Sequence, residues 1–212
     1  MSRALVFDAY GTLFDVHSVR ARCDALWPGK GAQLSQLWRT KQLEYTWQRS
    51  LMRRYEPFSK VTREALEYCC AALGLALDAG KADTLMDEYL RLALYPDAKS
   101  ALEKLRGAKL AILSNGSPDM LDPLVAHSGL RLDAVLSVHE LRAYKPAPQV
   151  YQLAVDKLAV PKEQIEFVSS NCWDALGAKS FGFRVCWINR TGAPVDRLGF
   201  TPDRILEGLA TL

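Results

Sequence analysis

Residues 4–14 read Ala4-Leu5-Val6-Phe7-Asp8-Ala9-Tyr10-Gly11-Thr12-Leu13-Phe14, and the organisation of the remaining chain follows from them. The four apolar residues at 4–7 predict a short buried strand with Asp8 at its C-terminal end. Gly11 permits a sharp turn, and Thr12 places a hydroxyl beside it. Because α/β sheets bind ligands at the C-terminal ends of their strands, Asp8 is a candidate for chemistry. Capping of the following turn is the alternative role for this carboxylate.

The composition is that of an ordinary globular protein, with 212 residues, 49% of them hydrophobic and 24% charged. The net charge is only +3 and no long basic run occurs, so we expect no nucleic-acid partner. No apolar run reaches about 18 residues and no signal-peptide pattern precedes the first strand, so we expect no membrane partner. The 5 cysteines form no CxxC pair, which favours reduced thiols, a cytoplasmic location and no zinc site.

The chain between Phe14 and Tyr95 has helical periodicity throughout. We expect helices over 17–27, 33–55, about 61–73 and 81–94, the third of them capped by Ser59 or Thr62. The second carries two apolar stripes, which predicts that it is covered on more than one face. Because no strand interrupts them, these helices predict a helical insertion.

Strands and helices alternate from residue 95 onward. The expected strands lie at 110–113, 134–138, 165–168 and 184–188, and the expected helices at 97–106, 117–127, 148–158, 173–180 and 203–210. This alternation predicts an α/β fold with a doubly wound, Rossmann-like parallel sheet. We therefore expect a core domain made of 1–14 and 95–212, and a four-helix cap subdomain made of 15–94.

Polar side chains follow three of the predicted strands. They are Asp8, the pair Ser114-Asn115 and the run Ser169-Ser170-Asn171. The C-terminal ends of parallel strands meet at one edge of a sheet, so these side chains should converge on one crevice.

Four short segments carry most of the candidate chemistry: Asp8–Thr12, Leu113–Ser117, Tyr144-Lys145-Pro146 and Ser169–Asp174. In order and spacing they resemble the four motifs of the haloacid dehalogenase superfamily. The residues Trp38-Arg39 and the run 42–47 are similar to the helical cap of its L-2-haloacid dehalogenases. The resemblance covers nearly the whole chain. It implies an aspartate nucleophile, a four-helix cap, no cofactor and a homodimer.

Two positions depart from the phosphoryl-transferring members of this superfamily, which use an Asp-x-Asp pair and Mg²⁺. Tyr10 stands at the second Asp position, and Ser170 stands where a metal-binding carboxylate is expected. Because Mg²⁺ prefers several anionic oxygens, we expect no metal site. A phosphatase or phosphonate hydrolase is the alternative function. A non-catalytic binding protein on the same fold is a third hypothesis.

The resemblance implies hydrolytic dehalogenation of short (S)-2-haloacids, such as chloroacetate and 2-chloropropionate, to (R)-2-hydroxy acids. Asp8 would displace the halide from C2 and form an ester, which water would then cleave. Arg39 and Asn115 would receive the halide, because they offer a fixed charge and an amide donor. Ser114 and the backbone N–H groups after Asp8, starting at Ala9, would bind the substrate carboxylate.

Lys145 would keep Asp8 ionised and offset the negative charge of the substrate. The candidates for orienting the hydrolytic water are Thr12, Asn171 and Asp174. Tyr151 is expected beside the halide, as a wall or a donor. The complete catalytic set is Asp8, Thr12, Arg39, Ser114, Lys145, Tyr151, Ser169, Asn171 and Asp174. The substrate-binding set is Ala9, Tyr10, Arg39, Phe58, Ser114, Asn115 and Trp173.

Each of these side chains also has a plainer role open to it. Arg39 can be a surface cation, Lys145 a loop lysine and Asp174 a helix cap. The aromatic residues Tyr10, Phe58, Tyr151 and Trp173 can be core residues. The histidines at 17, 127 and 139 match no catalytic position and are interpreted as structural.

Overall fold

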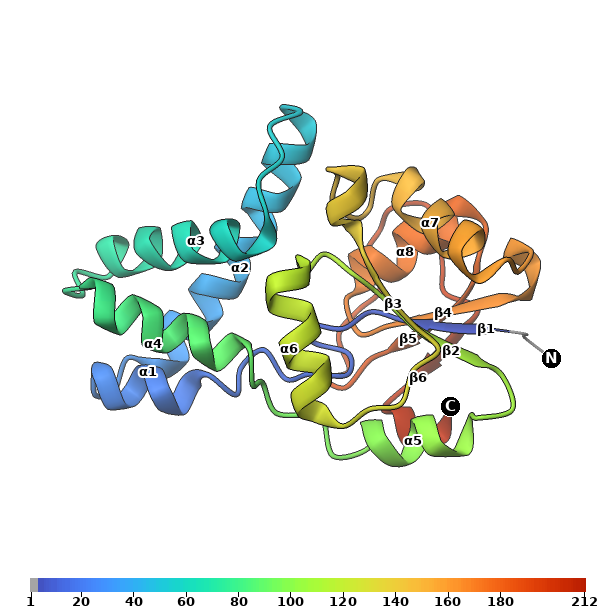
Figure 1. Cartoon of the computed structure of the whole chain (residues 1–212), viewed down its shortest axis with the longest axis horizontal. Helices are drawn as coiled ribbons and strands as arrows, with labels where there is room; N and C mark the ends of the chain where they lie inside the picture. The colour runs from blue at the N-terminus through green and yellow to red at the C-terminus, as the bar shows by residue number, and fades with distance from the viewer. Residues whose placement is uncertain (1–3) are drawn as a thin grey trace.

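A six-stranded parallel sheet lies at the centre of the computed structural model, which describes residues 4–212 (Figure 1). Residues 1–3, which belong to the expected core segment 1–14, lie outside the described part. The strand order is β3-β2-β1-β4-β5-β6. The strands are β1 (Ala4–Phe7), β2 (Lys109–Ser114), β3 (Ala134–Ser137), β4 (Ile165–Ser169), β5 (Arg184–Ile188) and β6 (Arg204–Leu206).

The central strand β1 is buried along its whole length, as its run of apolar residues predicts. Its register pairs Phe7 with Ile112 of β2 and with Val168 of β4. The residues that follow, Asp8 in the middle and the ends of β2 and β4 on either side, therefore lie at the same edge of the sheet. The predicted convergence of strand ends is confirmed.

Four consecutive helices separate β1 from the remaining sheet: α1 (Arg20–Leu26), α2 (Gly31–Leu51), α3 (Phe58–Ala72) and α4 (Ala79–Tyr89). They pack together to one side of the sheet (Figure 1). Trp38 of α2 is completely buried among them; its indole N–H donates to the Thr62 carbonyl at 2.8 Å, and its ring meets Tyr89 edge-on at 4.7 Å. The ring of Tyr10, directly after β1, contacts Phe58 at 5.4 Å. This contact joins the loop after β1, residues 8–14, to the helical segment.

The other helices return the chain between parallel strands. They are α5 (Ala98–Lys104), α6 (Pro118–Ser128), α7 (Pro148–Leu158) and α8 (Cys172–Phe181), with short 3₁₀ turns at η1 (Val138–Leu141), η2 (Lys162–Gln164) and η3 (Leu209–Thr211). The α/β class and the doubly wound sheet are confirmed. The bounds of α7 and β5 are those predicted, and most other bounds differ by one to four residues.

The predicted helix at 203–210 is wrong. Residues 204–206 form β6, which extends the sheet beside β5 by pairing Cys186 with Arg204. Only Leu209–Thr211 make a helical turn. Pro202 and Gly208 leave too few residues between them for a stable helix, and the open edge of β5 offers the backbone hydrogen bonds instead.

Three predictions for the helical segment also need correction. The helix α4 ends at Tyr89, because Leu94 forms an antiparallel bridge with Phe14. Neither Ser59 nor Thr62 caps α3, which begins at Phe58. The N-cap position is Pro57, whose ring restricts φ and whose backbone is extended just before the helix. The end of α2 is not covered on both faces, since Leu51 is 85% exposed.

None of the helices within residues 4–212 is long and apolar enough to span a bilayer. All five cysteines are free, and four of them are buried.

Candidate active site

Both carboxylate oxygens of Asp8 are held by neighbouring side chains. Oδ1 accepts a hydrogen bond from Lys145 Nζ at 3.0 Å. Oδ2 accepts two, from Thr12 Oγ1 at 3.0 Å and from Asn171 Nδ2 at 2.7 Å. These donors come from three separate segments of the chain and fix the plane of the carboxylate. An oriented carboxylate at a strand end has the geometry required of a nucleophile.

The loop after β1 owes its shape to Gly11. Its φ of +93° lies in the left-handed region that favours glycine, and its N–H donates to the Phe14 carbonyl at 2.7 Å. The turn carries Thr12 back over Asp8, where its hydroxyl also accepts from the Ser170 N–H at 2.8 Å. Asn171 donates a second bond to the Tyr10 carbonyl at 3.1 Å. The loops after β1 and β4 are thus held together by hydrogen bonds between their side chains and backbones.

Lys145 lies between two carboxylates in a dry environment. Its Nζ is 3.0 Å from Asp8 Oδ1 and 2.9 Å from Asp174 Oδ2, and its side chain is almost completely buried. Burial opposes the charge, but the carboxylates of Asp174 and Asp8 together keep the pKa of Lys145 above its ordinary value. Lys145 lies on the loop between η1 and α7, as the plainer interpretation has it, but its side chain is buried against Asp8 and Asp174 and so belongs to the site.

Asp174 is completely buried at the first turn of α8. Its Oδ2 also accepts from Ser169 Oγ at 3.1 Å, and its Oδ1 accepts from the Tyr151 hydroxyl at 2.8 Å. Burial raises the pKa of Asp174 to about 6, against the opposing effect of Lys145. The Lys145 ammonium thus lies between the Asp8 and Asp174 carboxylates, of which Asp174 is the more deeply buried.

This raised pKa predicts an acid limb in the rate of any step that requires the Asp174 carboxylate. The carboxyl group is protonated below about pH 6, so that rate should fall about tenfold per pH unit there. The folded state also holds this proton more tightly than the unfolded chain. The contribution of Asp174 to stability is therefore complete below about pH 4 and is lost as the pH rises through 6. Single-turnover rates from pH 4.5 to 8, with unfolding midpoints measured in parallel, test both signs; a flat rate profile would contradict the assignment.

The expected place of Tyr151 beside the halide does not agree with the structure. Its ring is completely buried against Phe167, at 5.6 Å, and its hydroxyl donates to Asp174. Gly177 makes this approach possible, because a Cβ there would lie 2.6 Å from the Tyr151 hydroxyl oxygen. Tyr151 therefore lies behind Asp174 and orients it.

Arg39 projects from α2 toward the loop after Asp8. It is 9% exposed, and it donates from Nη2 to the Tyr10 carbonyl at 3.2 Å and from Nη1 to Gln42 Oε1 at 2.8 Å. Gln42 in turn donates to Thr62 Oγ1 at 2.7 Å. A buried guanidinium held in this way is not a surface cation. The sequence reasoning did not select Gln42, although its position three residues after Arg39 on a buried stripe was a usable signal.

Two buried hydroxyls near the end of β2 have protons without an acceptor in the described residues. The Ser114 hydroxyl oxygen accepts from the Gly116 N–H at 3.0 Å but donates to no neighbour. The Tyr10 hydroxyl has no partner, and burial raises its pKa well above the ordinary value, so it stays protonated. Both lie close to Gly116, whose missing side chain leaves room for them. Buried donors without partners mark a place where an anionic group can bind. Nearby, Asn115 accepts from the Lys145 N–H at 3.0 Å.

A cavity of about 430 Å³ opens between α2 and the loops after β4 and β5. It reaches the Asp8 loop through Gly11, Arg39 and Asn171, whereas Asp8, Tyr10, Ser114 and Asn115 lie behind this lining. Its lining includes Gly11, His17, Arg39, Asn171, Trp173 and Arg190. Phe58 is buried against Tyr10 and has no place in this lining, so it supports the Tyr10 ring. His17 and Arg190 line the cavity but were not selected from the sequence. Burial lowers the pKa of His17, whose Nδ1 lies 2.8 Å from Ser35 Oγ.

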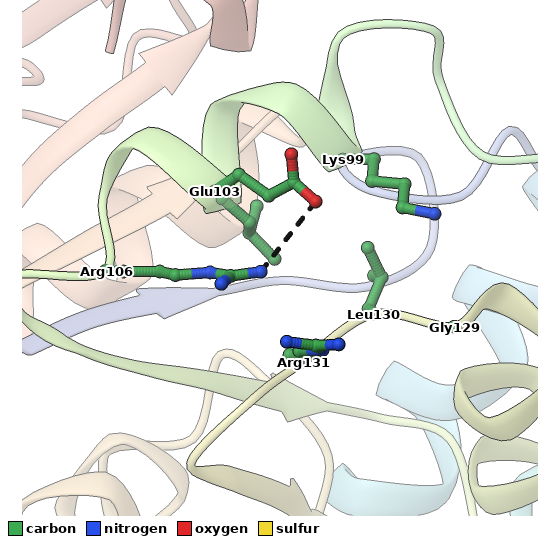
Figure 2. A pocket seen from close by; sticks show the side chains of 7 residues that line it. Lys99, Glu103, Arg106, Gly129, Leu130 and Arg131 are labelled. Atoms are coloured by element: carbon green, nitrogen blue, oxygen red, sulfur yellow. Dashed lines mark ion pairs between the residues drawn. The ribbon is translucent and has the colours of Figure 1, made fainter.

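Another pocket, of about 260 Å³, lies at the opposite edge of the sheet, between α5 and the segment after α6. Figure 2 shows Lys99, Arg106 and Arg131 around it, with Glu103 paired to Arg106 at 3.7 Å. These charged side chains are exposed, and none of the predicted site residues is among them. The cavity of about 430 Å³ is the candidate active site, because Arg39 and Asn171 line it and also bond to Tyr10 and Asp8 of the loop after β1.

The donor set around Asp8 does not fit Mg²⁺. Within residues 4–212 no group of three or more His, Cys, Asp or Glu side chains is arranged to hold a metal. The two carboxylates present, Asp8 and Asp174, already share the ammonium of Lys145. A divalent cation between them would have to displace that ammonium, since both need the same oxygens.

The comparisons with known proteins agree with this geometry. The family model described as haloacid dehalogenase-like hydrolase matches residues 2–182. The (S)-2-haloacid dehalogenase of Pseudomonas sp. (strain YL) is 54% identical over 205 residues, which cover 95% of this chain and 88% of that protein. The haloacetate dehalogenase H-2 of Moraxella sp. (strain B) is 50% identical over 204 residues, 94% of this chain and 91% of that protein.

A solved structure of L-2-haloacid dehalogenase from Xanthobacter autotrophicus, with chloropropionic acid covalently bound, superposes with a TM-score of 0.94. It is 43% identical, and the match covers 100% of this chain and 96% of that one. The sequence motifs, the parallel sheet with its helical segment and the Asp8 cluster all lead to the same family. The chain belongs to the haloacid dehalogenase-like hydrolases and, among them, to the L-2-haloacid dehalogenases.

Proposed function

We propose that this protein hydrolyses short (S)-2-haloalkanoic acids to (R)-2-hydroxy acids and halide through an ester on Asp8. The observation that carries the proposal is the Asp8 carboxylate itself, oriented by three donors at the strand end beside a cavity that contains a buried cation. The relative with covalently bound chloropropionic acid supports an enzyme-bound intermediate.

In the first step Asp8 attacks C2 of the substrate from the side opposite the halogen. The new C–O bond forms as the C–halogen bond breaks, the electron pair leaves with the halide, and C2 inverts. Arg39 and Asn115 receive the departing charge. Arg39 suits this role because it stays ionised and is already held at the loop by its bond to the Tyr10 carbonyl.

The substrate carboxylate would bind the two hydroxyls that lack acceptors, those of Ser114 and Tyr10, together with the backbone N–H of Ala9. Lys145 offsets the negative charges of substrate and nucleophile. Trp173, whose ring meets Trp47 edge-on at 5.4 Å, would form the wall toward the substrate chain.

In the second step water attacks the ester carbonyl of Asp8 and regenerates the carboxylate. Asp174 accepts the proton of that water, and Ser169, Tyr151 and Lys145 hold its carboxylate in place. Thr12 and Asn171, which bond to Oδ2 of Asp8, orient the carbonyl under attack. The tetrahedral intermediate collapses by breaking the bond between the Asp8 carbonyl carbon and the ester oxygen, which leaves as the hydroxyl oxygen of the product and takes back the proton from Asp174. The oxygen of the water stays in Asp8, whose carboxyl group releases the remaining proton and is again a carboxylate.

Phosphoryl transfer is the disfavoured alternative. Tyr10 stands where a phosphatase needs an acid that can give and withdraw a proton, and its phenol is too weak an acid at neutral pH, since burial raises its pKa further.

We also propose that residues 15–94 act as a cap over the core domain, and that the protein is a cytoplasmic homodimer with no nucleic-acid or membrane partner. The exposed Leu51 and Leu198 support the dimer, because they share the rim of an apolar cavity of about 470 Å³. The five free cysteines support a reducing compartment.

The proposal is tested by halide release from L- and D-2-chloropropionate, with and without EDTA. Arg39 from the helical segment and Ser114 from the sheet hold two substituents of C2, and the line of attack from Asp8 sets the third direction. The L substrate should therefore react at least about a hundredfold faster, which is the order of loss expected from misplaced reacting atoms. EDTA should change neither rate. Equal rates for the two enantiomers would refute the placement, and loss of activity restored by Mg²⁺ would favour a metal-dependent hydrolase.

A further inference from the structure

Arg190 lies beyond residue 182, where the family match ends, in the loop that follows β5 and two residues after its last residue. Its guanidinium makes a two-pronged ion pair with Asp97, from Nη1 at 2.9 Å and from Nη2 at 3.0 Å. Asp97 also accepts the backbone N–H of Leu209 at 2.7 Å. The carboxylate thus joins the end of β5 to the C-terminal segment, which lies against α5 (Figure 1).

The same guanidinium reaches the loop after β1, residues 8–14. Nη2 of Arg190 donates to the Thr12 carbonyl at 3.4 Å, and the guanidinium carbon lies 4.1 Å from the centre of the Tyr95 ring. The N–H of Tyr95 donates to the Leu13 carbonyl at 2.9 Å. The backbone of residues 12 and 13 is therefore held from outside the loop, by an arginine and by the residue on which it stacks.

Thr12 transmits this constraint to Asp8. Its hydroxyl donates to Asp8 Oδ2 and accepts from the Ser170 N–H, so the position of its backbone sets the direction of a hydrogen bond to the nucleophile. The Nε–H group of Arg190 is buried and has no hydrogen-bond partner among residues 4–212, and the charge of the guanidinium is matched by Asp97. A guanidinium whose charge is paired with a carboxylate through both Nη atoms is suited to holding a backbone carbonyl.

We infer that Arg190, held by Asp97, is a positioning residue for the nucleophile and acts through Thr12. The ion pair is closely packed, since a Cβ on Gly208 would lie only 2.8 Å from Asp97 Oδ2. Catalysis by an oriented carboxylate requires the reacting atoms to be held to within about half an ångström. Loss of a residue that holds the loop should therefore lower the rate of the chemical step by a measurable amount. The inference rests on the proposed function for its kinetic readout only.

The test compares R190M, R190K and D97N with a matched control, R204M. Arg204, the first residue of β6, also pairs with a carboxylate, that of Glu166 in β4 at 3.1 Å, but this pair lies at the edge of the sheet where the strands begin. We expect R190M to lower the rate of the first halide release at saturating L-2-chloropropionate about tenfold, with KM within about twofold of wild type. D97N should lower it similarly, and R190K should recover part of the loss because it keeps the charge but not the fork. R204M should leave both constants unchanged.

A second readout does not require turnover. Hydrogen exchange of the peptide covering residues 9–14 should become at least about tenfold faster in R190M and should stay at the wild-type rate in R204M. Unchanged exchange in R190M overturns the inference whether or not the wild type releases halide. A raised KM with unchanged kcat also overturns it, because Arg190 would then bind substrate. Failure of the proposed function is recognised separately, as a wild type that releases no halide while the exchange difference persists.

Discussion

Asp8→Asn should abolish turnover while leaving the protein folded, with a loss of about 10⁴-fold or more, as is usual when a covalent nucleophile is removed. The neutral amide is a poor nucleophile and cannot displace halide from carbon. The amide has the same shape as the carboxylate, and the Thr12 hydroxyl can accept as well as donate, so the hydrogen bonds around residue 8 can rearrange without a cavity. Initial rates of halide release measure the effect.

A carboxylate–lysine pair elsewhere in the chain provides the matched control. Asp203→Asn breaks the contact to Lys179 at 2.6 Å, away from the cavity, and should leave the rate unchanged. Acid quench of the wild type during turnover, followed by digestion, should show the substrate mass on the peptide that contains Asp8. If product oxygen comes directly from ¹⁸O water in a single turnover and none enters the enzyme, direct attack by water is the correct mechanism.

Asp174→Asn should separate the two chemical steps. Alkylation of Asp8 remains possible, whereas ester cleavage slows by about 10²–10⁴-fold, the usual cost of losing a positioned base. The variant should therefore release about one halide per active site and then stop with the ester in place. The new amide can still accept from Lys145 and Ser169 through its oxygen, so the fold should tolerate it. Rapid-quench measurement of halide gives the burst.

Arg39→Lys should slow the first chemical step on the same substrate, whereas Asp174→Asn slows the second. The flexible ammonium cannot reproduce the two directed bonds to Gln42 and to the Tyr10 carbonyl, so the first step should slow and no burst should appear. A burst with the Arg39 variant and none with the Asp174 variant would mean that the two roles are exchanged. Near-normal steady turnover of a folded Asp174→Asn protein would leave Asp174 with its buried structural contacts alone.

Local sequence pattern predicts the positions of some site residues but not their contacts. Asp8, Ser114 and Asn171 follow runs of apolar residues, and parallel strands bring such positions to one edge whatever surrounds them. The roles of the side chains in the third and fourth motifs were taken from the resemblance. Their contacts, above all the lysine between two carboxylates, appear only when segments 137 and 29 residues apart meet.

The errors share one physical cause. Tyr151 was placed beside the halide because its position matches the family, but its ring packs against Phe167 and its hydroxyl goes to the nearest buried acceptor, Asp174. Residues 204–206 were assigned to a helix because a short run carries little periodic signal, and the free edge of β5 decided their conformation.

The sequence by itself determined the order of strands and helices as far as β5, the parallel sheet and the edge at which Asp8 stands, because burial imposes a period and a polarity on each segment. Only the tertiary structure decided that Arg39 is buried at the Tyr10 carbonyl, that Gln42 and Arg190 support the site, and that Asp174 carries a raised pKa. These properties depend on partners that are distant in the chain and on the exclusion of water, and neither can be predicted from local composition.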